Sequence, residues 1–282
     1  MHVTAIVSTK GGVGKTTTAA NLGGLAADAG LRVLLLDLDV QPTLSSYYGL
    51  PHRAPAGCYE LLAYNESSRS QLICRTAVAG LDLVVSNDAQ GQLNTLLLHA
   101  PDGRLRLRNL LPLFRPHYDL MLIDTQGARS VLLEMAILAS DLLLSPVTPE
   151  ILAARELRRG TLQLLKDLAP YRRLGIDPPP MRLLINRVHP VSSNARAVQA
   201  ALRQVLFGEP GIRVLDTCIP AIEAFPRAAT AALHVHRLEY RRPFGRQAPA
   251  ALDTMRALAC EPYPQWQDRF ALVHGRLADA AC

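Results

Sequence analysis

A glycine-rich stretch at residues 8–17, with the sequence STKGGVGKTT, constrains the fold of this chain more than any other feature. It follows an apolar run over residues 3–7 and precedes a stretch of small and aliphatic residues. Strand, glycine loop and helix are the context in which a phosphate-binding loop occurs. Glycines let the backbone bend so that its N–H groups converge on phosphate oxygens, and the start of a helix adds partial positive charge. The loop is therefore expected to bind a nucleotide.

The side chains at the end of this loop are those that phosphate binding requires. Lys15 is expected to lie on the β- and γ-phosphates, and the Thr16 hydroxyl is expected to reach Mg²⁺. The general pattern G-x-x-x-x-G-K-[ST] begins with glycine, whereas this chain has Thr9 there and a second lysine, Lys10, after it. A glycine-rich turn that binds nothing is the alternative, but three glycines and two lysines after an apolar run favour a phosphate site.

Two further apolar runs end in aspartates. The first carries Asp37 and Asp39, and the second ends at Asp124, with Gly127 three residues later. Because the carboxyl ends of parallel strands share the edge of the sheet at which ligands bind, these acids are expected beside the glycine loop. Asp124 is expected to hold the Mg²⁺ shell through water, and Gly127 to sense a γ-phosphate through its N–H. Acids that merely end a strand in solvent are the alternative for the first pair.

The loop form K-G-G-x-G-K-[ST] resembles the deviant Walker A motif of the ParA/MinD family of ATPases, and the resemblance spans nearly the whole chain. It implies that Lys10 reaches across a dimer to the partner's nucleotide and that Asp39 helps to position the attacking water. Asn186 resembles the family's adenine-reading asparagine, and Pro220 the proline that closes over adenine. The implied catalytic residues are Lys10, Lys15 and Asp39, the implied Mg²⁺ contacts are Thr16 and Asp124, and the implied nucleotide contacts are Lys10, Gly11, Gly12, Val13, Gly14, Lys15, Thr16, Thr17, Asn186 and Pro220.

Two loops depart from the family pattern. In the loop after Asp39, proline has moved from the place of Val40 to position 42. In the loop after Asp124, Gln126 and Gly127 depart from the proline that is common in the family after this acid. A nucleotide-binding scaffold that does not hydrolyse ATP therefore stays open as an alternative. The glycine loop lies within the first 17 residues, and in this respect the chain resembles the small, Soj-like type of ParA protein.

Length allows one large α/β domain or two small ones. We expect a single ATPase domain over residues 1–282, in which residues 249–282 form a C-terminal helical extension packed on the core. Hydrophobic residues make up 49% of the chain, which excludes general disorder. Alternating apolar runs and helical patterns predict a mainly parallel, doubly wound sheet with helices on both faces. No apolar run approaches the ~20 residues of a membrane helix, no signal-peptide pattern is present, and the scattered cysteines predict no disulfides, so a cytoplasmic protein is expected.

The net charge of +6 favours a polyanionic partner, although it says little about specificity. Only three of the 30 basic residues are lysine, and two of these lie in the glycine loop, where a compact ammonium suits phosphate. The densest basic stretch lies near residues 227–246. A solvated arginine-rich loop is the alternative there, but DNA contacts are expected from Arg227, Arg237, Arg241, Arg242 and Arg246.

These features together predict a slow, Mg²⁺-dependent ATPase that dimerises on binding ATP, binds DNA nonspecifically and lets go after hydrolysis. The resemblance implies a ParB-like stimulating partner, a nucleoid-associated location and a role in segregating a plasmid, chromosome or mobile element, with no membrane partner. A MinD-like membrane-associated positioning ATPase, or a regulator of an envelope machine, is the alternative. An iron–sulfur carrier is disfavoured because paired cysteines are missing beside Asp124.

Overall fold

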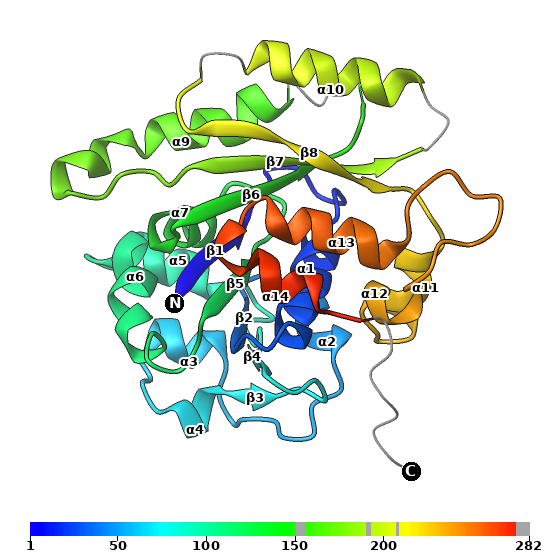
Figure 1. Ribbon diagram of the computed structural model, residues 1–282. Helices are drawn as coiled ribbons and strands as arrows, with labels where there is room; N and C mark the ends of the chain where they lie inside the picture. Colours follow the sequence, from blue (N-terminus) through cyan, green and yellow to red (C-terminus); the bar gives the residue numbers. More distant parts are fainter. Residues whose placement is uncertain (151–155, 190–192, 207–208, 275–282) are drawn as a thin grey trace.

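The computed structural model describes residues 1–150, 156–189, 193–206 and 209–274 (Figure 1). The strands of its sheet are β1 (His2–Ile6), β2 (Val33–Asp37), β3 (Cys74–Arg75), β4 (Leu81–Val84), β5 (Leu120–Asp124), β6 (Leu142–Val147), β7 (Met181–Val188) and β8 (Ile212–Pro220). The α-helices are α1 (Lys15–Asp28), α2 (Thr43–Tyr47), α3 (Cys58–Ala63), α4 (Arg69–Leu72), α5 (Gln92–His99), α6 (Arg106–Leu110), α7 (Val131–Ala139), α9 (Gln163–Asp167), α10 (Ser193–Val205), α11 (Ala224–Thr230), α12 (Val235–Leu238), α13 (Ala251–Cys260) and α14 (Gln267–Ala271). A π-helical turn, Arg158–Leu162, leads into α9.

The strands form one sheet in the order β3-β4-β2-β5-β1-β6-β7-β8, in which every pairing is parallel except that of β3 with β4. The central strands are near-continuous Val, Ile and Leu runs, because a parallel sheet is buried on both faces. The register pairs Asp124 with Ile6 on one side and with Asp37 on the other. This alignment confirms the mainly parallel α/β fold and brings the ends of three strands together.

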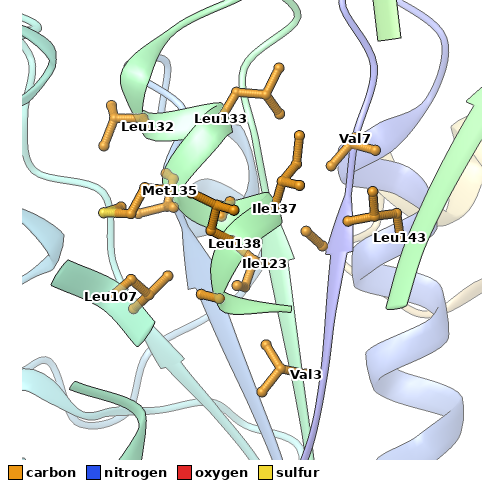
Figure 2. Close-up of a cluster of buried hydrophobic side chains, with 14 of the residues drawn as sticks. Val3, Val7, Leu107, Ile123, Leu132, Leu133, Met135, Ile137, Leu138 and Leu143 are labelled. Atoms are coloured by element: carbon orange, nitrogen blue, oxygen red, sulfur yellow. The ribbon is translucent and has the colours of Figure 1, made fainter. Parts of the chain in front are cut away.

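Each face of the sheet has its own apolar core. Successive residues of β5 point to opposite faces, so that Met121 and Ile123 belong to one core and Leu120 and Leu122 to the other. Figure 2 shows the first core, in which α7 side chains such as Ile137 lie over the sheet. Helices α3, α5, α6, α7, α9 and α10 contribute to this core, and α1, α2, α11, α12, α13 and α14 to the second. Helices thus cover both faces, as expected.

The C-terminal helices α13 and α14 pack on the second face of the sheet. Tyr263, between them, is fully buried, and its hydroxyl donates to Thr4 Oγ1 of β1 at 2.8 Å. Phe270 and Met255 are buried in the same core. Within the described part of the chain, no helix is long and apolar enough to cross a bilayer.

Helix α1 is tied to α12 by buried polar contacts. Asn21 Oδ1 accepts the backbone N–H of Val235 at 2.7 Å, and His234 lies so close to Gly24 that an added Cβ would come within 2.3 Å of its ring. His234 also pairs with the Tyr48 hydroxyl at 3.2 Å. Burial lowers the pKa of His234 to about 3, so the ring is neutral in the folded protein near pH 7.

Candidate nucleotide-binding site

The glycine loop joins β1 to α1 and adopts a conformation that needs glycine. Gly12 and Gly14 have φ values of 73° and 95°, in the left-handed region that side chains with a Cβ disfavour. Gly14 has a second constraint, because an added Cβ would lie 2.2 Å from Nδ2 of Asn186. The loop therefore forms as the sequence predicts.

Lys15, the first residue of α1, is buried, with 7% of its surface exposed. Burial lowers the pKa of Lys15, while the charges of Asp124 and Asp39 act to raise it. An ammonium group in this position at a helix N-terminus is suited to an anion that adds negative charge. The predicted phosphate lysine thus lies where the loop and the strand-end acids meet.

Thr16 and Asp124 form the next part of the site. Thr16 Oγ1 donates to Asp124 Oδ2 at 2.6 Å, while the other carboxylate oxygen, Oδ1, is buried and has no hydrogen-bond partner among the residues that the structure describes. Burial raises the pKa of Asp124 to about 7. The hydrogen bond from Thr16 acts to lower this pKa, and the negative charge of Asp37 acts to raise it. A buried carboxylate oxygen lacking a partner, next to a hydroxyl and a phosphate loop, fits the oxygen donor set of Mg²⁺.

Asp37, the last residue of β2, and Asp39 have different surroundings. Asp37 is fully buried and accepts hydrogen bonds from both the backbone N–H and the hydroxyl of Ser45, at 2.8 and 2.7 Å. Burial raises the pKa of Asp37 to about 6. Asp39 is only half-buried, and its Oδ1 accepts the N–H of Gln41 at 3.0 Å. Asp37 therefore fixes the segment that leads into α2, whereas Asp39 is partly exposed and its charge acts on both Lys15 and Asp124.

Lys10 lies at the rim of the loop and is paired within its own chain. Its Nζ is 2.9 Å from Glu150 and 3.0 Å from Glu156, and its side chain remains 39% exposed. The hydrogen bonds to these two glutamates raise the pKa of Lys10. Two carboxylates of the same chain thus pair with the Lys10 ammonium.

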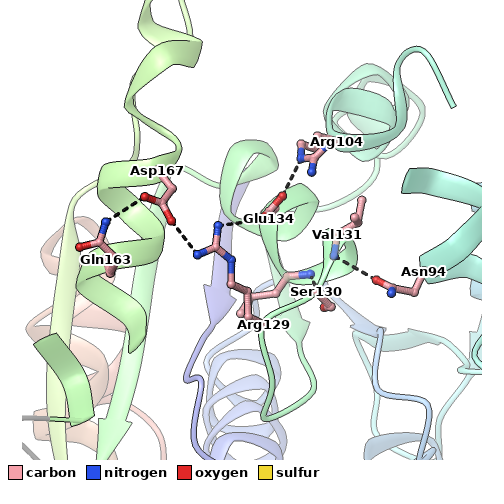
Figure 3. Close-up of polar contacts among 9 residues, drawn as sticks. Asn94, Arg104, Arg129, Ser130, Val131, Glu134, Gln163 and Asp167 are labelled. Atoms are coloured by element: carbon pink, nitrogen blue, oxygen red, sulfur yellow. Dashed lines mark hydrogen bonds and ion pairs between the residues drawn. The ribbon is translucent and has the colours of Figure 1, made fainter. Parts of the chain in front are cut away.

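The loop after Asp124 touches the glycine loop directly. A Cβ added to Gly127 would lie 2.6 Å from Cα of Gly11, so no side chain fits between the two segments. Two residues later, Arg129 donates to Asp167 of α9 at 2.6 Å and pairs with Glu134 of α7 (Figure 3). This network anchors the loop between two helices. The sequence pattern did not indicate the contact with Asp167, which lies 38 residues after Arg129.

A cavity of about 520 Å³ opens beside the loop, between α1, the ends of β7 and β8, and α11. Four predicted residues, Gly14, Thr17, Asn186 and Pro220, line it. Asn21, Phe225 and Met255 also line it, although no sequence motif indicated them. Apolar and aromatic walls with a few polar groups are typical of a site for a flat heterocycle.

Asn186 has a structural contact that its sequence position did not reveal. Its Nδ2 donates to the backbone carbonyl of Val13 at 2.7 Å, and its Oδ1 accepts the N–H of Arg187. The side chain therefore holds the glycine loop against β7. Arg187 itself has a φ of 61°, an unusual value for a residue with a side chain.

The five predicted DNA-binding arginines divide into two groups. Arg237 pairs with Asp28 at the end of α1, and Arg246 pairs with Glu239, so both are engaged inside the fold. Burial alone would raise the pKa of Asp28, but Arg237 and His236 hold that pKa well below its usual range. The exposed members are Arg227, Arg241 and Arg242.

A glycine loop, a buried lysine and a threonine–aspartate pair at the edge of a parallel sheet define a P-loop nucleotide-binding protein. Residues 1–173 match a family profile described as an AAA domain. The chain belongs to this family, and specifically to the ParA/MinD P-loop ATPases.

Individual relatives agree with this assignment. An uncharacterized protein of Mycobacterium tuberculosis is 31% identical over 232 residues, which cover 81% of this chain and 70% of the relative. The sporulation initiation inhibitor protein Soj of Bacillus subtilis is 32% identical over 166 residues, which cover 59% of this chain and 64% of Soj.

Solved structures have the same fold. Apo McdA from Cyanothece has a TM-score of 0.75 at 23% identity, covering 97% of this chain and 98% of McdA. A variant of McdA in complex with ATP has a TM-score of 0.74, also at 23% identity, and covers 97% of this chain and 95% of that one. At this level of identity the likeness supports the fold alone.

Proposed function

We propose that this chain is an ATP-dependent, dimerising switch that binds DNA nonspecifically and hydrolyses ATP to segregate a plasmid, a chromosome or a mobile element. The observation that carries the proposal is the position of α11 between two sites. Phe225, Pro226 and Ala229 of α11 line the cavity beside the glycine loop. Arg227, from another side of the same helix, lines a second hollow with Arg241. A nucleotide that presses on α11 would therefore move an arginine surface.

The site residues have complementary tasks in this proposal. Lys15 neutralises charge on the phosphates, and Asp39 orients the attacking water. Thr16 and Asp124 would hold Mg²⁺, which supplies positive charge to the phosphate oxygens. Few residues at this edge of the sheet are candidates for covalent catalysis. Phosphoryl transfer does not need them, because it depends mainly on positioning the phosphate and the attacking water.

Lys10 is the residue on which the proposed dimerisation depends. In the isolated chain this lysine is paired with Glu150 and Glu156 at the rim of the site. We infer that it exchanges these carboxylates for a phosphate of the nucleotide in the partner subunit, so that two chains enclose two nucleotides. A ParB-like protein that stimulates hydrolysis, and a cytoplasmic, nucleoid-associated location, belong to the same proposal.

The test is a titration of random-sequence duplex DNA with ATP, ADP or no nucleotide over a range of salt concentrations. The proposal predicts binding with ATP only, weakened steeply by salt because arginines displace counterions from phosphates. The variant Lys15→Ala is expected to lose both ATP binding and DNA binding.

Binding that is indifferent to nucleotide would overturn the switch. Flotation with anionic vesicles, run in parallel with ATP and with ADP, separates this function from that of a membrane-associated positioning ATPase. ATP-dependent flotation without DNA retention would favour the membrane alternative.

A further inference from the structure

The loop between α12 and α13 presents an aromatic side chain to solvent. Phe244 is 107% exposed, more than any other large hydrophobic side chain of the described residues. In Figure 1 this segment projects from the body of the molecule as an orange loop beside α11 and α12. An exposed phenylalanine contributes no burial to the fold, so stability does not explain its position.

Phe244 occupies the outer corner of a tight turn. The carbonyl of Pro243 accepts the N–H of Arg246 at 3.3 Å, which closes a four-residue turn. Gly245, the third residue, has a φ of 76°, and a positive φ at this position is what type II turns reserve for glycine. Phe244 is therefore the second residue of the turn, at its tip.

The base of the loop is closed by an ion pair. Glu239 accepts Nη1 of Arg246 at 2.7 Å and the backbone N–H of Ala251 at 3.0 Å, and Arg246 also donates to the carbonyl of Pro249 at 3.0 Å. Arg246 thus has a structural role in the loop. A loop closed in this way loses little conformational freedom when it meets a partner.

Arginines surround the tip. Arg241 and Arg242 immediately precede Pro243 and are exposed, and the guanidinium of Arg241 lies 5.7 Å from the centre of the Tyr240 ring. Arg227 of α11 meets Arg241 in a hollow of about 310 Å³. Within the described ranges, neither Arg227 nor Arg242 is paired with an acid, so their charges are available to a polyanion.

We propose that Phe244 is an apolar wedge that enters the minor groove of double-stranded DNA and partly unstacks a base step, while Arg241 and Arg242 contact the flanking phosphates. The inference rests on the proposed function, because it concerns the same DNA-bound state. An apolar side chain between arginines is the combination with which minor-groove proteins unstack DNA. A bilayer surface would require a broad apolar face, and this loop offers one aromatic ring.

The first test compares affinities for a random-sequence duplex with a non-hydrolysable ATP analogue. Phe244→Ala is expected to weaken binding roughly tenfold, because the stacking contact is lost, while the slope of affinity against salt stays unchanged. Arg242→Ala is expected to lower that slope by about one, as for one lost phosphate contact. Leu174→Ala, which alters another exposed apolar residue, is the matched control and should bind like the parent chain.

The second test measures unwinding of plasmid DNA relaxed by a topoisomerase in the presence of the protein and the analogue. The parent chain should change the linking number, Phe244→Leu should retain most of the change because leucine is also an apolar wedge, and Phe244→Ala should abolish it. If Phe244→Ala binds and unwinds DNA like the parent chain, the wedge is refuted while ATP-dependent DNA binding stands. If the parent chain binds no DNA, both proposals fail. If Phe244→Ala instead loses only binding to phosphatidylglycerol vesicles, the loop is a membrane contact and the wedge is refuted.

Discussion

Replacing Gly14 by alanine tests how the glycine loop and β7 support each other. Alanine at a φ of 95° carries the cost of left-handed backbone, about 1–2 kcal/mol. Its Cβ would also lie 2.2 Å from Nδ2 of Asn186, which must move and break its bond to the carbonyl of Val13. Losing that hydrogen bond costs about 0.5–1.5 kcal/mol, so Gly14→Ala should lower the free energy of unfolding by about 1.5–3.5 kcal/mol.

Urea unfolding without nucleotide measures this effect, and two further variants isolate its cause. Gly11→Ala is the control, because an added Cβ at Gly11 meets no atom within 4 Å, and its unfolding curve should match the parent's. In an Asn186→Ala background the clash is absent, so Gly14→Ala should lower the free energy of unfolding only by the cost of the left-handed backbone. The reasoning is refuted if Gly14→Ala is as mild as Gly11→Ala, or if its cost is the same with and without Asn186.

Three other predictions concern pH, dimerisation and hydrolysis. The depressed pKa of His234 means that the unfolded chain binds a proton that the fold excludes, so stability should fall as pH drops below about 6.5, by at most about 1.4 kcal/mol per pH unit. Urea unfolding at two pH values should show a shallower fall for His234→Gln, and an equal fall would contradict the assignment. Glu156→Gln removes one partner of Lys10 and should increase the dimer fraction with ATP several-fold in sedimentation velocity, whereas Asp177→Asn, at a separate surface pair, should not. Asp39→Ala should retain ATP binding by calorimetry but hydrolyse ATP at least about tenfold more slowly in a phosphate-release assay, and parental turnover would remove it from the mechanism.

Local sequence was sufficient to predict the glycine loop and the strand-end position of Asp124. Glycines, a lysine and a threonine in fixed order determine the loop, and an apolar run that ends in Asp124 determines where the acid lies on a parallel sheet. The parallel register then pairs Asp124 with Asp37 and Ile6. These features depend on neighbours in the chain or on a single repeated strand geometry, so they could be predicted.

Residues whose role depends on distant partners could not be predicted in this way. Arg237 belongs to a basic run, but its partner is Asp28, 209 residues earlier in the chain. The family resemblance assigned Asn186 to adenine, and the strand was expected to end there, but β7 continues to Val188. The Asn186 amide donates to the carbonyl of Val13, 173 residues away. Ion pairs and hydrogen bonds between distant residues depend on the tertiary structure, which composition and motif spacing do not predict.

Helix α1 connects the nucleotide site to the arginine-bearing segment. Its 14 residues span about 21 Å, and it begins with Lys15 in the nucleotide site and ends at Asp28, where Arg237 of α12 is attached. Asn21 joins the same helix to Val235 midway along its length. If α1 behaves as a rigid rod, a tilt of a few degrees at Lys15 would displace the segment that carries Arg237, without any change within the helix.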